Sequence, residues 1–313
     1  MKFYLFFIIS LLVSYWAIAQ NKPYKNEIGI QTDNDGYLAR GQDRYYTAGN
    51  FLYFNHALDI KDTSRLVNKI LGFELGQKIY TAQSGIVLTP NYVDRPFAGY
   101  LYVGSSLNLL YKNEHNLKFE AQMGFVGPHA YGKETQDLIH KIFGFYTPDG
   151  WEYQIQNDFE LNLSAQYNGS VFRIDQFDMA FNSYVNLGTG ITGAGLGATF
   201  RLGTFGPLYN SISTTSSVSA SGKPTRELFL YYKPLLNLVA YDATIQGSMF
   251  TSGPASGEVV RTIEPVVLSQ QIGGDLVIGH WVIDASAIFQ SHTTKEMFKT
   301  EQWGSLSFLY RFH

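Results

Sequence analysis

Apolar and polar residues alternate along much of this chain, most clearly between Gln154 and Tyr167. One set of alternate positions is apolar apart from Asn157, and the other set is polar throughout. The apolar set comprises Ile155, Phe159, Leu161, Leu163, Ala165 and Tyr167. Successive side chains of a strand point to opposite faces, so this pattern predicts a strand with one apolar face. Its length of about 14 residues exceeds that of most globular strands and suits a tilted strand that crosses a membrane.

The end of the chain repeats the pattern. An apolar face made largely of aromatic residues alternates there with a polar face that includes Arg311. The apolar face is Leu306, Phe308, Tyr310 and Phe312, and the polar face is Ser305, Ser307 and Arg311. Asn168-Gly169, which follows the first stretch, is a favoured hairpin dipeptide and predicts a turn between two strands.

Similar segments recur about twelve times, within the range of outer-membrane barrels. They are expected to start near Glu27, Thr47, Ile70, Phe97, Leu117, Glu152, Val171, Ile191, Arg226, Glu258, Asp275 and Gln302. We therefore predict an all-β fold, a single transmembrane antiparallel β-barrel. An even number of strands places both termini on the periplasmic side. Residues 205–223 are rich in Ser, Thr and Gly and leave the strand boundaries there open.

One segment, Gly132 to Gly144, has the pattern of a helix instead. Gln136 and His140 lie four residues apart in it, so both side chains share one face of the helix. An imidazole exchanges protons near neutral pH. The sequence thus predicts a short helix in an extracellular loop that carries a proton-transfer site.

Residues 1–19 have the features of a secretory signal peptide. A single charge, Lys2, precedes an apolar run, and Ala17-Ile18-Ala19 resembles a cleavage site. We expect residues 20–313 to form the exported barrel in the cell outer membrane. No later stretch reaches 18 consecutive apolar residues, so no transmembrane helix is expected.

Composition narrows the possible functions. Charged residues and aromatic residues each make up 16% of the chain, and there is no cysteine. Low charge and many aromatics suit a lipid-facing band with aromatic girdles. The lack of cysteine excludes disulfides, thiolate nucleophiles and cysteine-bound zinc. The net charge of −3 argues against a nucleic-acid partner, and we expect a monomer.

Strand parity brings three unusual segments to the outward rim of the predicted barrel. They are the loop with Asn34 and Asp35 that ends at Asp43-Arg44-Tyr45-Tyr46-Thr47-Ala48-Gly49, the loop Asp94-Arg95-Pro96-Phe97-Ala98-Gly99, and the helix with Gln136 and His140. The carboxylate and amide oxygens of Asn34 and Asp35 suit a hard cation such as calcium. The same residues also suit a polar turn.

The other rim residues likewise have two interpretations. His140 is a candidate base or a solvated loop histidine. Thr47 is a candidate hydroxyl in the site or an ordinary strand residue. Arg95 is a candidate phosphate contact or the partner of Asp94 in a loop ion pair. Serine catalysis has no local support, since no G-x-S-x-G motif occurs.

Several motifs in order resemble those of the outer-membrane lipid A 3′-O-deacylase family. They are Asn34-Asp35, Asp43 to Gly49, Gly76-Gln77-Lys78-Ile79-Tyr80-Thr81, Asp94 to Gly99, and Gly127-Pro128 with Gly132, Gln136, His140, Gly144 and Gly150-Trp151. The resemblance extends from residue 27 to residue 160 and continues more loosely to the end. Motifs in sequence are far more specific than any one alone.

The resemblance implies a twelve-stranded barrel that removes the 3′-linked acyloxyacyl chain from lipid A in lipopolysaccharide, in a calcium-dependent reaction similar to that of secreted phospholipases. It implies that His140 activates water and that Gln136 lines or orients the site. Asn34 and Asp35 would help to bind Ca²⁺, which would stabilise the oxyanion. Thr47 would lie in the same pocket, and Arg95 would contact a phosphate of lipid A.

The chain departs from the family pattern at one point. The family has an acidic residue shortly after the catalytic helix, and here only Asp149 and Glu152 are candidates, neither in register. Two other functions remain open from the sequence: a non-catalytic barrel, such as a channel or structural protein, and a barrel phospholipase with a serine nucleophile.

Overall fold

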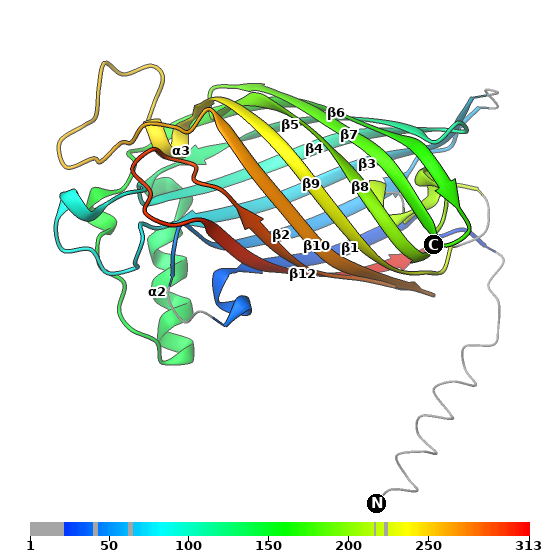
Figure 1. Ribbon diagram of the computed structural model, residues 1–313, viewed down its shortest axis with the longest axis horizontal. Helices are drawn as coiled ribbons and strands as arrows, with labels where there is room; N and C mark the ends of the chain where they lie inside the picture. The colour runs from blue at the N-terminus through cyan, green and yellow to red at the C-terminus, as the bar shows by residue number, and fades with distance from the viewer. Residues whose placement is uncertain (1–21, 40–42, 62–64, 216, 222–224) are drawn as a thin grey trace, which may run out of the picture.

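The computed structural model describes residues 22–313 except 40–42, 62–64, 216 and 222–224. Its described residues form a closed barrel in which each of twelve strands pairs antiparallel with its neighbours, and β1 closes on β12 (Figure 1). The strands are β1 Asn26–Asn34, β2 Tyr46–Ala57, β3 Leu66–Tyr80, β4 Ala98–Tyr111, β5 His115–Val126, β6 Asp158–Ile174, β7 Phe177–Gly188, β8 Ile191–Thr204, β9 Glu227–Asp242, β10 Val266–Ile278, β11 Trp281–Gln290 and β12 Glu301–Phe312. The predicted all-β barrel and its strand number are confirmed.

The alternation in the sequence corresponds to the two faces of the barrel wall. On β6, Leu161 and Leu163 are exposed on the outer face, whereas Glu160 between Phe159 and Leu161 is buried in the lumen. On β12, Phe308 is exposed and Arg311 is completely buried. Apolar side chains thus cover the outside, where lipid would lie, and polar side chains fill the inside.

The predicted turn at Asn168-Gly169 is wrong, because both residues lie within β6. The side chain of Asn168 donates to Asn116 at 2.7 Å and accepts from Asn182 at 2.6 Å. These asparagines form a ladder across neighbouring strands inside the lumen, which satisfies the amides without a turn. The chain reverses between β6 and β7 instead, so the strand start expected at Val171 is also wrong.

Three further strand starts differ from expectation. β6 begins at Asp158 and not at Glu152, because the preceding residues pack over the barrel end, where Ile155 is fully buried. β10 begins at Val266 and not at Glu258, and Asp275 lies within β10. The long loop before β10 carries polar and apolar residues in short runs that imitate strand periodicity.

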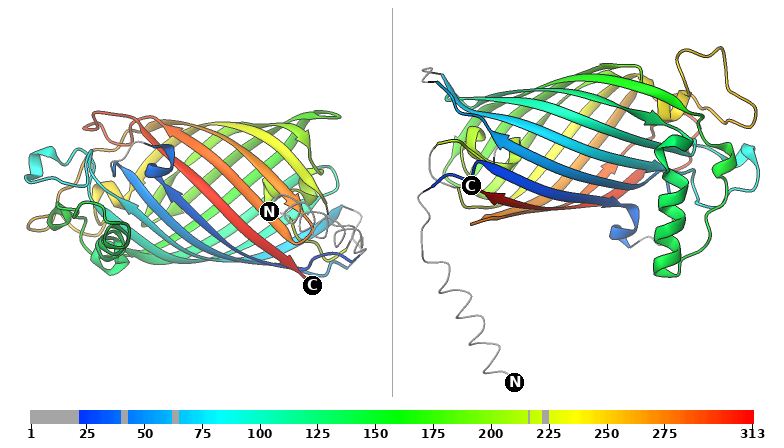
Figure 2. Two further views of the ribbon diagram at one scale, coloured as in Figure 1. Left: turned by 90° about the horizontal axis from the view of Figure 1, so that it is seen from below. Right: turned by 180° about the vertical axis from the view of Figure 1, so that it is seen from behind.

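The connections between strands differ at the two ends of the barrel. Figures 1 and 2 show the C-terminus at one end and the helices α2, Gly132–Phe143, and α3, Ala243–Gln246, at the other. Every connection after an odd-numbered strand lies at the helix-bearing end, as the antiparallel order of consecutive strands requires. The prediction that the three unusual loops share one rim is therefore correct.

Among the described residues, no helix is long and apolar enough to cross a membrane. The expected signal peptide, residues 1–19, lies outside the described residues.

The segment between β8 and β9 folds back into the barrel at the end that carries the C-terminus. Asn68 and Asn108, on β3 and β4, donate to the carbonyls of Val218 and Thr214, each at 2.8 Å. Arg311 on β12 donates to the carbonyl of Ser217 at 2.9 Å. Contacts from three strands therefore hold this segment as a plug in the lumen.

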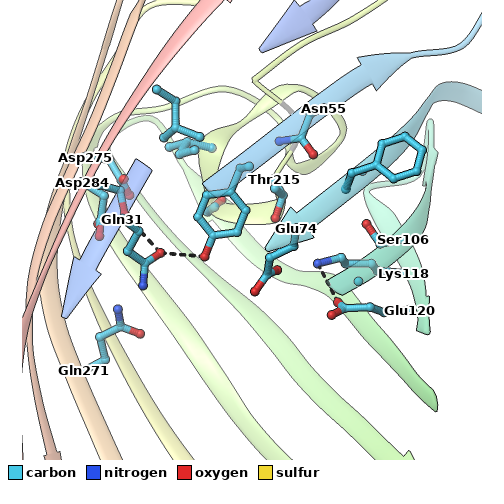
Figure 3. Close-up of a pocket in the computed structure, with 18 of the residues that line it drawn as sticks. Gln31, Asn55, Glu74, Ser106, Lys118, Glu120, Thr215, Gln271, Asp275 and Asp284 are labelled. Atoms are coloured by element: carbon cyan, nitrogen blue, oxygen red, sulfur yellow. Dashed lines mark hydrogen bonds and ion pairs between the residues drawn. The ribbon is translucent and has the colours of Figure 1, made fainter. Parts of the chain in front are cut away.

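A polar cavity of about 370 Å³ lies in the lumen above the plug (Figure 3). Its wall carries the carboxylates of Glu74, Glu120, Asp275 and Asp284, and Lys118 pairs with Glu120 at 3.2 Å. None of the described residues that line it is a histidine, and it lies inside the barrel. This cavity is therefore not where we place the chemistry.

Candidate active site

A second pocket, of about 260 Å³, lies at the helix-bearing rim. It is enclosed by α2, by the 3-10 helix η2, Asp35–Leu38, and by the ends of β2 and β3. The two helices project outside the barrel wall (Figures 1 and 2). The pocket brings together five of the six residues singled out in the sequence: Asn34, Asp35, Thr47, Gln136 and His140.

Strand register places this pocket on the outer wall. Ala48 and Ile79 line the pocket and pair across β2 and β3. Leu52 and Leu75 pair four residues further along the same strands and are 54% and 43% exposed. Residues separated by four on a strand share a face. The pocket therefore opens on the lipid-facing side and not into the lumen.

The predicted helix is confirmed as α2, and its buried face is formed by Gly132, Gln136 and His140. A side chain at Gly132 would meet the ring of Trp151 at 2.9 Å and the Cα of Gly99 at 3.1 Å. The glycine thus allows the helix to pack directly on the barrel end. The helix ends at Gly144, whose φ of 69° is favoured for glycine, and Phe145 then donates to the His140 carbonyl at 2.9 Å.

Both ring nitrogens of His140 have a partner. Nδ1 lies 2.6 Å from the carbonyl oxygen of Tyr146. A carbonyl only accepts, so Nδ1 carries a proton and donates. Nε2 lies 2.8 Å from Oδ2 of Asp43. The loop after α2 therefore fixes the ring orientation and turns Nε2 towards a carboxylate in the pocket.

Asp43 is the residue on which the site converges. Its Oδ2 accepts from Nε2 of Gln136 at 2.5 Å and from the hydroxyl of Tyr146 at 2.8 Å, beside His140. Burial and the charge of Asp43 raise the pKa of Tyr146, so its hydroxyl stays a donor. Trp151 in turn donates to Oε1 of Gln136 at 2.7 Å, which fixes the amide. Donors from two side chains, Gln136 and Tyr146, thus hold a carboxylate next to the imidazole.

Asp35 carries the least satisfied polar atom of the pocket. Its Oδ2 accepts from the backbone of Arg44 at 2.6 Å, whereas its buried Oδ1 has no partner among the described residues. Burial and, to a smaller extent, Asp43 raise the pKa of Asp35 to about 8. Asn34 uses its Oδ1 to accept from the amide of Gly36 at 2.7 Å, which caps η2. Asn34 and Asp35 therefore form the polar turn that the sequence allowed, and the same turn also carries a carboxylate oxygen without a described partner.

An orphaned carboxylate oxygen near a second carboxylate is what a hard cation would neutralise, and its oxygen donors suit calcium. The residues present fit such an ion in donor chemistry. Within the described part of the chain, no set of three or more His, Asp or Glu side chains is already arranged around a cation position.

Thr47 lines the pocket and is buried, and its hydroxyl is 2.8 Å from that of Thr81. Arg95 does not line the pocket. It is buried and stacks over the ring of Tyr80 at 3.8 Å, and it donates to Thr244 at 3.1 Å. Its contact with a lipid A phosphate stays a prediction that this geometry does not support.

Asp43 and Tyr146 were not predicted as site residues from the sequence. Asp149 and Glu152, the acidic candidates after the helix, do not line the pocket. The backbone carbonyl of Asp149 accepts a hydrogen bond from the backbone amide of Val87, and the side chain of Glu152 is exposed. Asp43 supplies the carboxylate from a loop on the other side of the pocket. The signals for it in the sequence were its place in the rim loop, four residues before Thr47, and its place at the start of the motif Asp43 to Gly49.

The family model "Outer membrane protein LpxR" matches residues 5–312. This chain belongs to the LpxR family. It is the family that the sequence motifs resemble, so the expected enzyme class, an outer-membrane lipid A deacylase, is confirmed. Membership of this family also supports localisation in the outer membrane and a lipopolysaccharide substrate.

One solved structure of the same family has this fold. LpxR from Salmonella typhimurium matches with a TM-score of 0.73 and 21% identity, over 92% of this chain and 100% of that one. The β domain of the Bordetella autotransporter BrkA matches with a TM-score of 0.46 and 10% identity, over 92% of this chain and 99% of that one. A comparison with curated protein sequences gives no match.

Proposed function

We propose that this enzyme hydrolyses the 3′-linked acyloxyacyl ester of lipid A, with His140 as the base that activates water and calcium as the electrophile. One observation carries the proposal: a histidine held by a backbone carbonyl and facing a carboxylate, in a pocket on the outer barrel wall. The substrate ester lies at the headgroup level of the leaflet that such a pocket faces.

The height of the pocket suits this ester. Leu52 and Leu75 belong to the apolar band, and the pocket residues Ala48 and Ile79 lie four residues above them. Four residues of strand span ~13 Å along the strand, less along the axis of a tilted barrel. A lipid whose acyl chains lie against the apolar band can therefore place its ester in the pocket without leaving the membrane.

His140 is suited to act through Nε2. Because Nδ1 is committed to the Tyr146 carbonyl, Nε2 is the nitrogen that exchanges a proton with the pocket. In the structure Nε2 points at Oδ2 of Asp43, so the attacking water reaches this nitrogen after that carboxylate turns aside on substrate binding. From beside the ring, the carboxylate then stabilises the imidazolium that forms when water gives up its proton. Gln136 keeps that carboxylate in place.

Asn34 and Asp35 are the residues that we propose for the calcium ion. Bound calcium would polarise the ester carbonyl and stabilise the oxyanion. In the described part of the site, Oδ1 of Asp35 lacks a partner, and Thr47 borders the same space. The ion would also offset the repulsion between Asp35 and Asp43.

The two other functions considered from the sequence have less support. A channel needs an open lumen, but the segment between β8 and β9 fills one end of it. A serine mechanism needs a serine beside the base, and none of the described residues that line the pocket of His140 is a serine.

The test is mass spectrometry of lipid A from cells that express either the intact chain or His140→Ala. The intact chain should remove one acyloxyacyl mass, and the variant should remove ~10²–10⁴-fold less. Heat-modifiable gel mobility checks that both barrels are folded. Equal deacylation by both would remove His140 from its proposed role, and loss of a different chain would reject the 3′ assignment.

A further inference from the structure

The outer side of α2 exposes an apolar surface that packing against the barrel does not explain. Leu138 and Ile142 are 58% and 66% exposed, and Phe143 and Phe145 at the end of the helix are 67% and 61% exposed. The charged residues of the helix occupy other faces, where Lys133 pairs with Asp137 at 2.6 Å. A helix with one apolar and one charged side is typical of segments that lie in a membrane interface.

A contact with the barrel wall shows which side of α2 faces the bilayer. Thr135 accepts from the amide of Gln77 at 3.1 Å. Gln77 lies on the outward face of β3, two residues from Ile79 in the direction of the exposed Leu75. The side of the helix that carries Thr135 is therefore turned towards the apolar band.

Helical spacing places the apolar residues on this same side. Leu138, Ile139 and Ile142 follow Thr135 by three, four and seven residues, so they share its stripe. The helix lies across the barrel axis and outside the wall (Figures 1 and 2). The stripe is therefore parallel to the membrane surface, directly above the lipid-facing band of β2 and β3.

We propose that α2 is an in-plane membrane anchor whose Leu138 and Ile142 insert among the acyl chains of the outer leaflet. The occupant of this face is lipid, since the apolar stripe continues the band formed by Leu52 and Leu75. Two pocket-lining residues, Ile139 and Phe145, extend the stripe towards His140. The helix thus connects the leaflet to the pocket. This anchor goes beyond the proposed function, and only the kinetic test below rests on that function.

Site-directed spin labelling tests the anchor without reference to activity. The chain has no cysteine, so single variants Leu138→Cys and Ile142→Cys each give one labelling site. Lys141→Cys, on the charged side of the same helix, is the matched control. In vesicles that contain lipopolysaccharide, the labels at 138 and 142 should be more accessible to oxygen than to a water-soluble nickel chelate. The label at 141 should show the reverse, and aqueous accessibility at all three positions would overturn the anchor.

The kinetic test separates the anchor from the chemistry. The double variant Leu138→Ser/Ile142→Ser should raise the KM for lipid A in vesicles about tenfold, because part of the apolar surface no longer gains from burial in lipid. In detergent micelles its kcat should equal that of the intact enzyme, and Lys141→Ser should change neither value. An unchanged KM in vesicles would contradict the anchor, whereas an intact protein that cleaves no lipid A would contradict the proposed function and leave the spin-label result standing.

Discussion

At the scale of single residues, the site depends on a carboxylate that no local motif identifies. The carboxylate of Asp43 accepts hydrogen bonds from Gln136 and Tyr146, which lie 93 and 103 residues further along the chain. Gln136 and His140 could be predicted because their spacing is a local property of a helix. Asp43 and Tyr146 could not, because their roles depend on how two loops pack over the outer wall.

Replacing Asp43 by Asn should lower kcat about 10–100-fold. The amide keeps the size of the side chain but removes the charge that stabilises the His140 imidazolium, and a charge-assisted hydrogen bond contributes about 1.5–3 kcal/mol. Deacylation rates of the purified variant in micelles measure the effect. Asp149→Asn is the control, since Asp149 lies outside the pocket. Equal rates for the two variants would remove Asp43 from the mechanism.

Asp35 makes the stability of the cation-free protein depend on pH. Its pKa is raised to about 8, above the ordinary value of 3.8, so the folded state holds a proton that the unfolded state has lost. Stability from this group therefore falls as pH rises from about 4 to about 8. In chelator, the intact protein should lose more Tm between pH 6 and pH 9 than Asp35→Asn does. Added calcium should restore Tm at pH 9 in the intact protein only, and a parallel loss in both proteins would argue against this account.

At the scale of elements, α2 positions the site because it approaches the barrel end so closely. Gly132→Ala would bring a methyl group to 2.9 Å from Trp151, the residue that fixes Gln136. The helix must then move, and a displacement of ~1 Å in a catalytic group can cost 10²-fold in rate. We expect a large loss of kcat with normal heat-modifiable mobility. Glu134→Ala, at an exposed position of the same helix, should keep full activity, and a fully active Gly132→Ala would show that the close approach is not needed.

Strand elements were predicted well where one face meets lipid and less well elsewhere. Along β6 the outer residues Leu161 and Leu163 and the buried Glu160 follow the alternation in the sequence. Asn168 misled the prediction because the same side chain suits a hairpin turn and an amide ladder in a polar lumen. The lumen of a barrel accepts turn-forming residues within strands, so their local preference does not decide the structure there.

At the scale of the whole molecule, one end of the barrel carries the proposed site and the other end is closed. The pocket of His140 lies at the helix-bearing rim, and the segment between β8 and β9 fills the lumen at the opposite end. The proposed site and the closure of the lumen are thus built from different loops, and a change at one end need not affect the other.

This separation predicts the behaviour of a chain that lacks the plug. Deleting residues 208–221 and joining the ends with a short Gly-Ser linker should open the lumen, because the three strands that hold the segment then face water. In planar bilayers the intact protein should show no steady conductance, and the deletion variant should conduct. Its lipid A deacylation in micelles should remain, since the pocket on the outer wall keeps all its contacts. Steady conductance by the intact protein would mean that the segment leaves the lumen, and it would revive the channel as a second activity of this barrel.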